Sequence, residues 1–198
     1  MKGISTFAKK FNVPVYANKE TWDAMPEVQE KVANKNYFNP NEKFEIGDLK
    51  ISPFSIPHDA ANPCGFNIFH GNTKMSVATD IGHMDKSLIK NLEESSFVLL
   101  ESNYDPNILK CSRYPYSLKQ RISGPNGHLS NEAAGKTICY LMSWGLKNVM
   151  LGHLSKENNF PELAYKTVVE ELLNQNLDEN SINISVANRL APSKIIEL

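Results

Sequence analysis

The sequence has few of the features that identify secreted, membrane-spanning or strongly charged proteins. Its 198 residues include only three cysteines, Cys64, Cys111 and Cys139, and no C-x-x-C pair. An odd number of widely separated cysteines argues against a disulfide framework and a thiolate zinc site, and it indicates a reducing compartment. The net charge of −1 gives no general attraction to nucleic acid or membranes. An anionic substrate would therefore need a local basic patch.

Long apolar runs are also missing. No stretch approaches the roughly 20 apolar residues that a membrane-spanning helix needs, and the first residues, M-K-G-I-S-T-F-A-K-K-F, are too polar for a signal peptide. We therefore expect a cytoplasmic protein with no membrane partner. A composition of 41% hydrophobic and 22% charged residues predicts a globular core. At this length we expect one domain, or a large part of one, over residues 1–198.

Hydrophobic patterning predicts a layered α/β fold. The first half is rich in period-two segments and includes a hairpin turn at 70–72, whereas strands and helices alternate in the second half. Residues 26–42 are polar and are predicted to form a surface loop. This order favours at least one mixed sheet with helices outside it. Strands are expected at 13–16, 49–54, 65–69, 74–79, 97–100, 146–151 and 182–186, and helices at 3–11, 18 or 19 to 25, 86–93, 131–144 and 161–173.

Three residues follow predicted strands and have the chemistry of metal ligands. They are His58 in S-I-P-H-D, Asp80 in V-A-T-D-I-G and His153 in M-L-G-H-L-S. Imidazole and carboxylate groups bind zinc, manganese and iron, and one carboxylate can bridge two ions about 4 Å apart. Since the three residues end different strands, they could converge on one edge of a sheet. The alternative is that each is an ordinary surface or hydrogen-bonding residue.

The order of several motifs extends this argument. The segments H-D-A-A-N-P-C-G-F, A-T-D-I-G, E-S-N-Y-D, G-H-L-S-N-E-A-A and G-H-L-S-K-E-N-N occur in that order, after V-P-V-Y-A-N-K-E-T-W and around R-Y-P-Y-S-L-K-Q-R-I. Together they resemble the metallo-β-lactamase superfamily, and within it the YycJ/WalJ branch of bacterial metallohydrolases. The resemblance runs from Lys2 to the C-terminus and implies an αββα sandwich with mixed sheets and outer helices.

The resemblance also implies roles for individual residues. It makes His58 a ligand of a first metal ion, Asp80 a bridging ligand and His153 a ligand of a second ion. His128 matches a histidine that assists proton transfer in ribonuclease Z-like enzymes, and Glu101 matches the acidic residue that orients it. The cofactors implied are two divalent ions, zinc or manganese.

One departure from the family is plain. Its H-x-H-x-D-H motif, which supplies two histidines to one ion and an aspartate and a histidine to the other, occurs nowhere in this sequence. Zinc sites normally have three or more protein ligands, so the remaining candidates are few for tight binding. The resemblance therefore predicts an N-terminally incomplete domain that lacks its first strands and is catalytically inactive.

Simpler interpretations of the accessory residues stay open. His128 could shape the start of the helix that follows, with Ser130 or Asn131 as its cap, and Glu101 could be an ordinary surface carboxylate. Asp59 could form a turn or support His58. His70, in the hairpin turn, is expected to be exposed, and His83 matches no ligand position.

The densest basic stretch is K-C-S-R-Y-P-Y-S-L-K-Q-R, at 110–121. Cations bind phosphates and aromatic rings stack on bases, so the stretch suits a nucleic-acid strand. The alternative is a solvated charged helix above packed tyrosines. The candidate substrate-binding residues are Arg113, Tyr116, Lys119 and Arg121.

These observations favour metal-dependent phosphodiester hydrolysis, with DNA as the substrate in an exonuclease-like reaction. A hydrolase of small esters, lactones, thioesters or cyclic phosphodiesters is the first alternative, because a shared fold does not decide the substrate. A non-catalytic fragment or scaffold domain is the second. The sequence indicates no oligomeric state.

Overall fold

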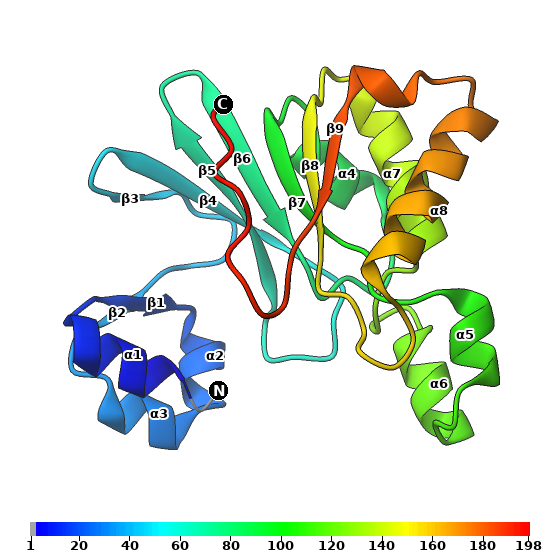
Figure 1. Ribbon diagram of the computed structural model, residues 1–198. Helices are drawn as coiled ribbons and strands as arrows, with labels where there is room; N and C mark the ends of the chain where they lie inside the picture. Colours follow the sequence, from blue (N-terminus) through cyan, green and yellow to red (C-terminus); the bar gives the residue numbers. More distant parts are fainter. Residues whose placement is uncertain (1–2) are drawn as a thin grey trace.

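The computed structural model describes residues 3–198 and contains, over that range, a seven-stranded mixed sheet and a separate two-stranded sheet (Figure 1). The large sheet has the strand order β3-β4-β5-β6-β7-β8-β9. Its strands are antiparallel from β3 to β6 and parallel from β6 to β9. The predicted mixed α/β fold is therefore confirmed.

The small N-terminal unit contains α1 (Ile4–Phe11), α2 (Lys19–Asp23), α3 (Pro26–Lys31) and the parallel pair β1 (Val15–Ala17) and β2 (Lys35–Tyr37). Its centre is the fully buried Trp22, which packs with Ala17 and Val32. The predicted loop over 26–42 was therefore wrong, because it contains α3 and β2. Neither element has a clear apolar period, and packing around Trp22 explains why both form.

Hairpins build the antiparallel part of the large sheet. They consist of β3 (Phe44–Ile46), β4 (Leu49–Ser55), β5 (Cys64–His70) and β6 (Thr73–Ala78). The turn between β5 and β6 includes Gly71 at φ +55, a conformation that glycine adopts without steric cost. The long segment between β4 and β5 carries His58.

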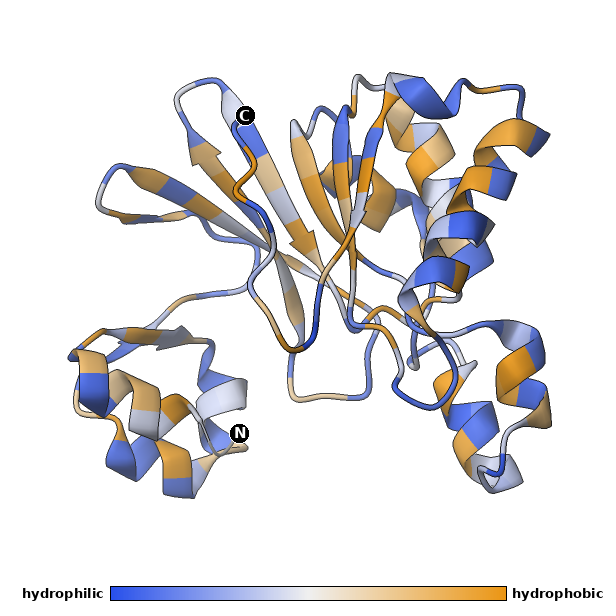
Figure 2. Ribbon diagram, in the orientation of Figure 1, coloured by the Kyte–Doolittle hydropathy of each residue, from blue (hydrophilic) through white to orange (hydrophobic). Residues whose placement is uncertain are grey.

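Helices connect the parallel strands β7 (Phe97–Glu101), β8 (Asn148–Gly152) and β9 (Asn183–Val186). The helices α4 (Lys86–Leu92), α7 (Asn131–Met142) and α8 (Pro161–Asn174) contribute to one core with the inner residues of these strands. In Figure 2 the parallel strands are orange over much of their length, and α7 and α8 alternate orange and blue, as amphipathic helices do. Two short helices, α5 (Pro106–Cys111) and α6 (Tyr116–Ile122), and the 3₁₀ turn Glu179–Ser181 complete the fold.

The two faces of the large sheet differ. Val98, Leu100, Val149 and Leu151 are buried against the helices. The alternate residues on the other face are half-buried, and they include Phe66, Ile68, Met75, Val77, Leu99 and Met150. Within residues 3–198 the helices thus cover one face of one large sheet. No helix in that range is long and apolar enough to span a membrane.

Candidate metal centre

Three acidic or imidazole side chains lie at the carboxyl ends of adjacent parallel strands. Asp80 follows β6, Glu101 ends β7, and His153 follows β8. Ala78 pairs with Leu100 and Glu101 pairs with Gly152, so the three strand ends are in register. The carboxyl edge of a parallel sheet is the usual place for a site in α/β folds.

The backbone at two of these positions is unusual. Asp80 has φ of 60° and His153 has φ of 54°. Non-glycine residues rarely adopt positive φ, although aspartate and histidine do so more often than most. Surrounding contacts must hold such conformations, and they concentrate at functional sites. Here Asn103 Nδ2 donates to the His153 carbonyl at 2.7 Å and helps to hold that turn.

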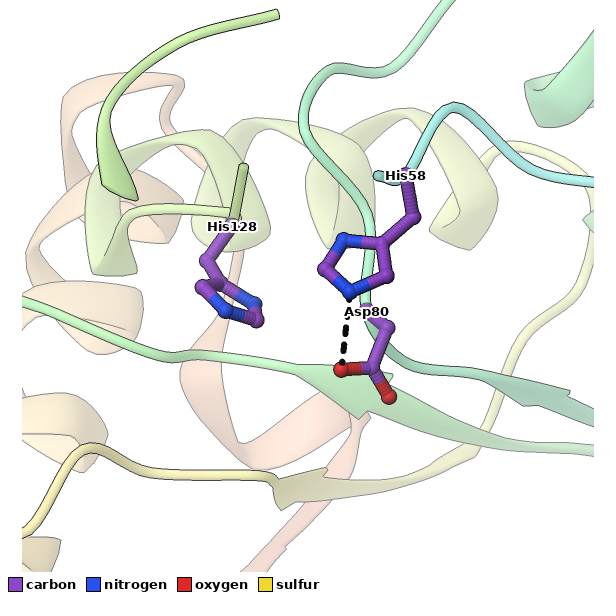
Figure 3. A group of neighbouring side chains, drawn as sticks. All are labelled: His58, Asp80 and His128. Carbon is purple, nitrogen blue, oxygen red and sulfur yellow. Dashed lines mark ion pairs between the residues drawn. The ribbon is translucent and has the colours of Figure 1, made fainter. Parts of the chain in front are cut away.

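His58 reaches the same edge from the loop after β4. Its Nδ1 lies 3.0 Å from the carbonyl oxygen of Gly127. A carbonyl can only accept a hydrogen bond, so Nδ1 carries a proton, and in the neutral ring Nε2 keeps a free lone pair. Nε2 lies 3.6 Å from Asp80 Oδ1, which places the two groups face to face (Figure 3).

Glycine permits this approach. A Cβ atom on Gly127 would lie 2.2 Å from the carbonyl oxygens of Arg121 and Ile122. Such a separation is far below van der Waals contact, so no larger residue fits without a backbone shift. Gly127 therefore lets the loop before α7 pack closely enough to hold His58.

Glu101 lies at the centre of the cluster and is fully buried. Its Oε1 accepts from Nδ1 of His153 at 2.7 Å and from Nδ1 of His128 at 2.8 Å. Its Oε2 accepts from the backbone amides of Ile81 at 2.6 Å and Leu129 at 3.3 Å. One carboxylate thus joins the loops that carry Asp80, His128 and His153. The interpretation of Glu101 as a surface carboxylate was wrong.

The electrostatics agree with an ionised Glu101. Burial raises the pKa of this carboxyl group, but the hydrogen bonds from His128, His153 and the Ile81 amide outweigh burial and leave the pKa below its ordinary value. The hydrogen bond to Glu101 in turn raises the pKa of His153, against the effect of burial. Both histidines donate through Nδ1, so each keeps Nε2 for another partner.

The residues fit a divalent ion chemically and geometrically. Two groups of three have ligand atoms within 4.8 Å of one another: His58, Asp80 and His128, and Glu101, His128 and His153. Ligand atoms about 2.0–2.2 Å from a tetrahedral zinc ion lie about 3.4 Å apart. The 3.6 Å between His58 Nε2 and Asp80 Oδ1 is close to that separation. A carbonyl or carboxylate bond at Nδ1 is also the usual support for a histidine that binds metal through Nε2.

A buried asparagine network supports the cluster, and the sequence interpretation missed it. Asn159 Nδ2 donates to the carbonyls of Ser102 and Asn103 and to Asn131 Oδ1, at 2.8–3.0 Å. Ser102 Oγ donates to the same Asn131 oxygen. These bonds connect the segments after β7 and β8 to the start of α7. No sequence period identifies such a network, because its members lie on three separated segments.

Only part of the basic stretch faces the site. A cavity of about 660 Å³ beside His128 and His153 is lined by Arg121 but not by Arg113, Tyr116 or Lys119. Lys119 Nζ donates to the Lys110 carbonyl, and the hydroxyl of Tyr116 bonds to Gln120. Arg121 itself pairs with Asp59.

The same cavity is lined by residues that the sequence interpretation did not select. They are Tyr114 on the segment before α6, Lys156 after β8 and Arg189 after β9. Arg189 could have been selected by its position after the last strand. Because β9 is parallel to β8, its carboxyl end must lie at the same edge of the sheet as His153.

His70, His83 and the residues at the start of α7 have ordinary structural contacts. His70 is exposed and lies 3.3 Å from Asp48, as expected for a turn residue. His83 is exposed and bonds to the Pro125 carbonyl. Ser130 is the N-cap of α7 and accepts from the Ala133 amide, so the capping prediction for Ser130 was correct while His128 faces Glu101.

Comparison with known proteins agrees with this fold. Residues 1–153 match the family model described as "Beta-lactamase superfamily domain". That match covers more than half of the chain, so the chain belongs to the β-lactamase superfamily. Solved structures with the same fold include the metallo-β-lactamase fold protein YhfI from Bacillus subtilis, with a TM-score of 0.63, 16% identity and coverage of 94% of this chain and 69% of that one. Another is Zn(2+)-bound PqqB from Methylobacterium extorquens, with a TM-score of 0.65, 14% identity and coverage of 98% and 69%.

Curated relatives are closer in sequence. The chain is 33% identical over 174 residues to "Exodeoxyribonuclease YycJ" of Bacillus anthracis, covering 87% of this chain and 66% of that protein. It is 34% identical over 179 residues to "Exodeoxyribonuclease WalJ" of Streptococcus pneumoniae, covering 88% and 66%. The resemblance to the YycJ/WalJ branch is therefore confirmed. The chain spans 66% of the length of these relatives.

Proposed function

We propose that this edge of the sheet is the metal-dependent hydrolytic site of a DNA phosphodiesterase. The observation that carries the proposal is the position of Glu101, whose Oε1 lies within 2.8 Å of Nδ1 of both His128 and His153. A buried carboxylate that fixes two histidines, next to His58 and Asp80, suits a site for divalent ions and proton transfer. The names of the relatives, exodeoxyribonucleases, support DNA as the substrate class.

Residues His58, Asp80 and His153 would hold the ions, zinc or manganese. When bound, such ions act as Lewis acids and lower the pKa of a water molecule to about 7. Three side chains are few for two ions. We therefore expect weak binding, with occupancy only at raised metal concentration.

The chain's own residues would move and hold the proton. His128 donates to Glu101 through Nδ1, so a second proton at Nε2 makes an imidazolium that the carboxylate stabilises. That Nε2 proton would pass to the leaving oxygen of the phosphodiester. Glu101 keeps the ring oriented and does not itself transfer a proton. The cations that line the neighbouring cavity would hold the anionic substrate.

The test has two parts. Titration calorimetry with zinc and with manganese measures ion binding, and release of nucleotides from labelled DNA measures hydrolysis over a range of metal concentrations. We expect weak binding and slow, metal-dependent hydrolysis that His128→Ala reduces about a hundredfold or more. Binding without hydrolysis of DNA would overturn the nuclease assignment. Absence of binding would overturn the metal site.

A further inference from the structure

The cavity beside His128 and His153 has an unusual distribution of charge. Its lining includes three cationic side chains, Arg121, Lys156 and Arg189, and no carboxylate. The whole chain has a net charge of −1, so this concentration of positive charge is local. Its volume of about 660 Å³ lies in the ordinary range of ligand sites.

Two of these cations have no acidic partner. Arg121 pairs with Asp59, but among the residues that the structure describes neither Lys156 nor Arg189 forms an ion pair. An unpaired cation in a cavity favours an anionic ligand, because the ligand then supplies the missing counter-charge.

Arg189 is held at the cavity wall. Its Nη2 donates to the Leu154 carbonyl, one residue after His153, at 2.6 Å. This bond uses one of the five N–H donors of the guanidinium, and the others remain for an oxygen ligand. The backbone bond also fixes the position of the side chain relative to the candidate metal ligands.

The first cavity shares part of its lining with a second one. The second cavity has a volume of about 750 Å³ and shares Leu154, Ser155, Lys156 and Arg189 with the first. Each cavity has one aromatic side chain in its lining, Tyr114 in the first and Phe160 in the second. Phe160 is 49% exposed, which leaves about half of an apolar side chain open to solvent. Glu162 lies in the lining of the second cavity and is the one acidic residue there.

From this arrangement we infer that the two cavities form a groove for single-stranded DNA, which enters past Phe160 and ends at the histidines. Lys156 and Arg189 bind backbone phosphates between the two cavities, and Tyr114 and Phe160 stack on the bases on either side. Cations that bind phosphates, placed beside aromatic rings that stack on bases, are the arrangement by which proteins hold single strands. This inference rests on the proposed function for its substrate class.

Binding without metal tests the groove apart from catalysis. Fluorescence anisotropy of a labelled oligothymidine, measured in EDTA at several salt concentrations, gives the Kd and its salt dependence. We expect Lys156→Ala and Arg189→Ala each to raise the Kd about tenfold and to lower the slope of log Kd against log salt by about 0.7. Phe160→Ala should raise the Kd about tenfold and leave the slope unchanged, because stacking involves no ion release.

Matched controls keep the test specific. Lys166→Ala removes an exposed lysine of α8 that lies outside both cavities, and it should change neither the Kd nor the slope. Arg189→Lys keeps the charge and should recover most of the affinity, whereas a purely structural role of Arg189 would leave Arg189→Lys as weak as Arg189→Ala. Equal effects of Lys156→Ala and Lys166→Ala, or tighter binding of duplex than of single strand, would overturn the groove. Loss of hydrolysis alone would leave the binding pattern intact and count against the proposed function instead.

Discussion

The two sides of the candidate metal centre are built differently. On one side, Glu101 is fully buried and accepts four hydrogen bonds from His128, His153, Ile81 and Leu129. On the other side, Asp80 has a side chain 40% exposed and faces His58 across 3.6 Å. The hydrogen bonds of Glu101 connect the loops that carry Asp80, His128 and His153. Asp80 and His58, on the other side, connect fewer segments of the chain.

This difference separates two tasks that one site must perform. Buried polar groups that are fully hydrogen-bonded fix a unique arrangement, and removing one of them leaves others unsatisfied. Candidate ligands that take part in few hydrogen bonds can accept an ion or substrate at little structural cost. We therefore expect substitutions on the buried side to lower both stability and metal affinity, and substitutions on the open side to lower metal affinity alone.

The largest effect is expected at Glu101. Glu101→Ala removes the acceptor of two backbone amides and two imidazoles, and it should lower the free energy of unfolding by about 3–5 kcal/mol. Urea denaturation in EDTA measures this loss. Glu170→Ala, at an exposed position of α8, is the control and should change stability by less than about 0.5 kcal/mol. A stable Glu101→Ala variant would show that the four hydrogen bonds do not hold the loops together.

Gly127 tests the packing of the loop that supports His58. Gly127→Ala places a Cβ atom 2.2 Å from two carbonyl oxygens, and the backbone must move. We expect a loss of about 1–3 kcal/mol in the free energy of unfolding. Gly3→Ala is a matched control, because a Cβ atom there meets nothing within 4 Å. If both variants unfold at the same urea concentration, the close approach is not a structural requirement.

Asn159 tests the second layer of the buried side. Asn159→Ala removes bonds to two backbone carbonyls and to Asn131, so we expect a loss of about 2 kcal/mol and a weaker metal affinity. Asn174→Ala, at the exposed end of α8, should leave both quantities unchanged. Unaltered metal affinity of Asn159→Ala would confine the network to a structural role.

Helices and strands with a clear apolar spacing could be predicted from the sequence. The first helix was predicted at 3–11 and spans Ile4–Phe11, because its apolar spacing and the residue that ends it, Asn12, are local signals. Helix α3 and strand β2 were missed because packing around Trp22, rather than periodicity, explains them. A local signal is contained in one segment of the sequence. Packing depends on contacts between segments that lie far apart in the sequence.

The same distinction applies to the site. Asp80 and His153 were selected because each follows a strand, and the structure brings both to one edge. The resemblance paired Glu101 with His128, but the contact of Glu101 with His153 was not predicted, because it follows from β7 and β8 being neighbours in the sheet. The contribution of Arg189 likewise depends on β9 being the neighbour of β8.

The smallest effect on stability is expected at His58. A substitution there is the sharpest test of the difference between the two sides of the site. The side chain makes one hydrogen bond, to the Gly127 carbonyl, so His58→Ala should lower the free energy of unfolding by about 1 kcal/mol or less in EDTA. Loss of a ligand should nevertheless weaken zinc or manganese binding at least tenfold, as measured by titration calorimetry.

His70→Ala is the matched control for His58→Ala, because it removes an exposed turn histidine and should change neither quantity. A large loss of stability in His58→Ala would mean that the open side also holds the fold, and the division between the two sides would then fail. Normal metal affinity would remove His58 from the ligand set. The expected pattern, weak binding in a stable protein, arises only if His58 serves the ion and Glu101 serves both the ion and the fold.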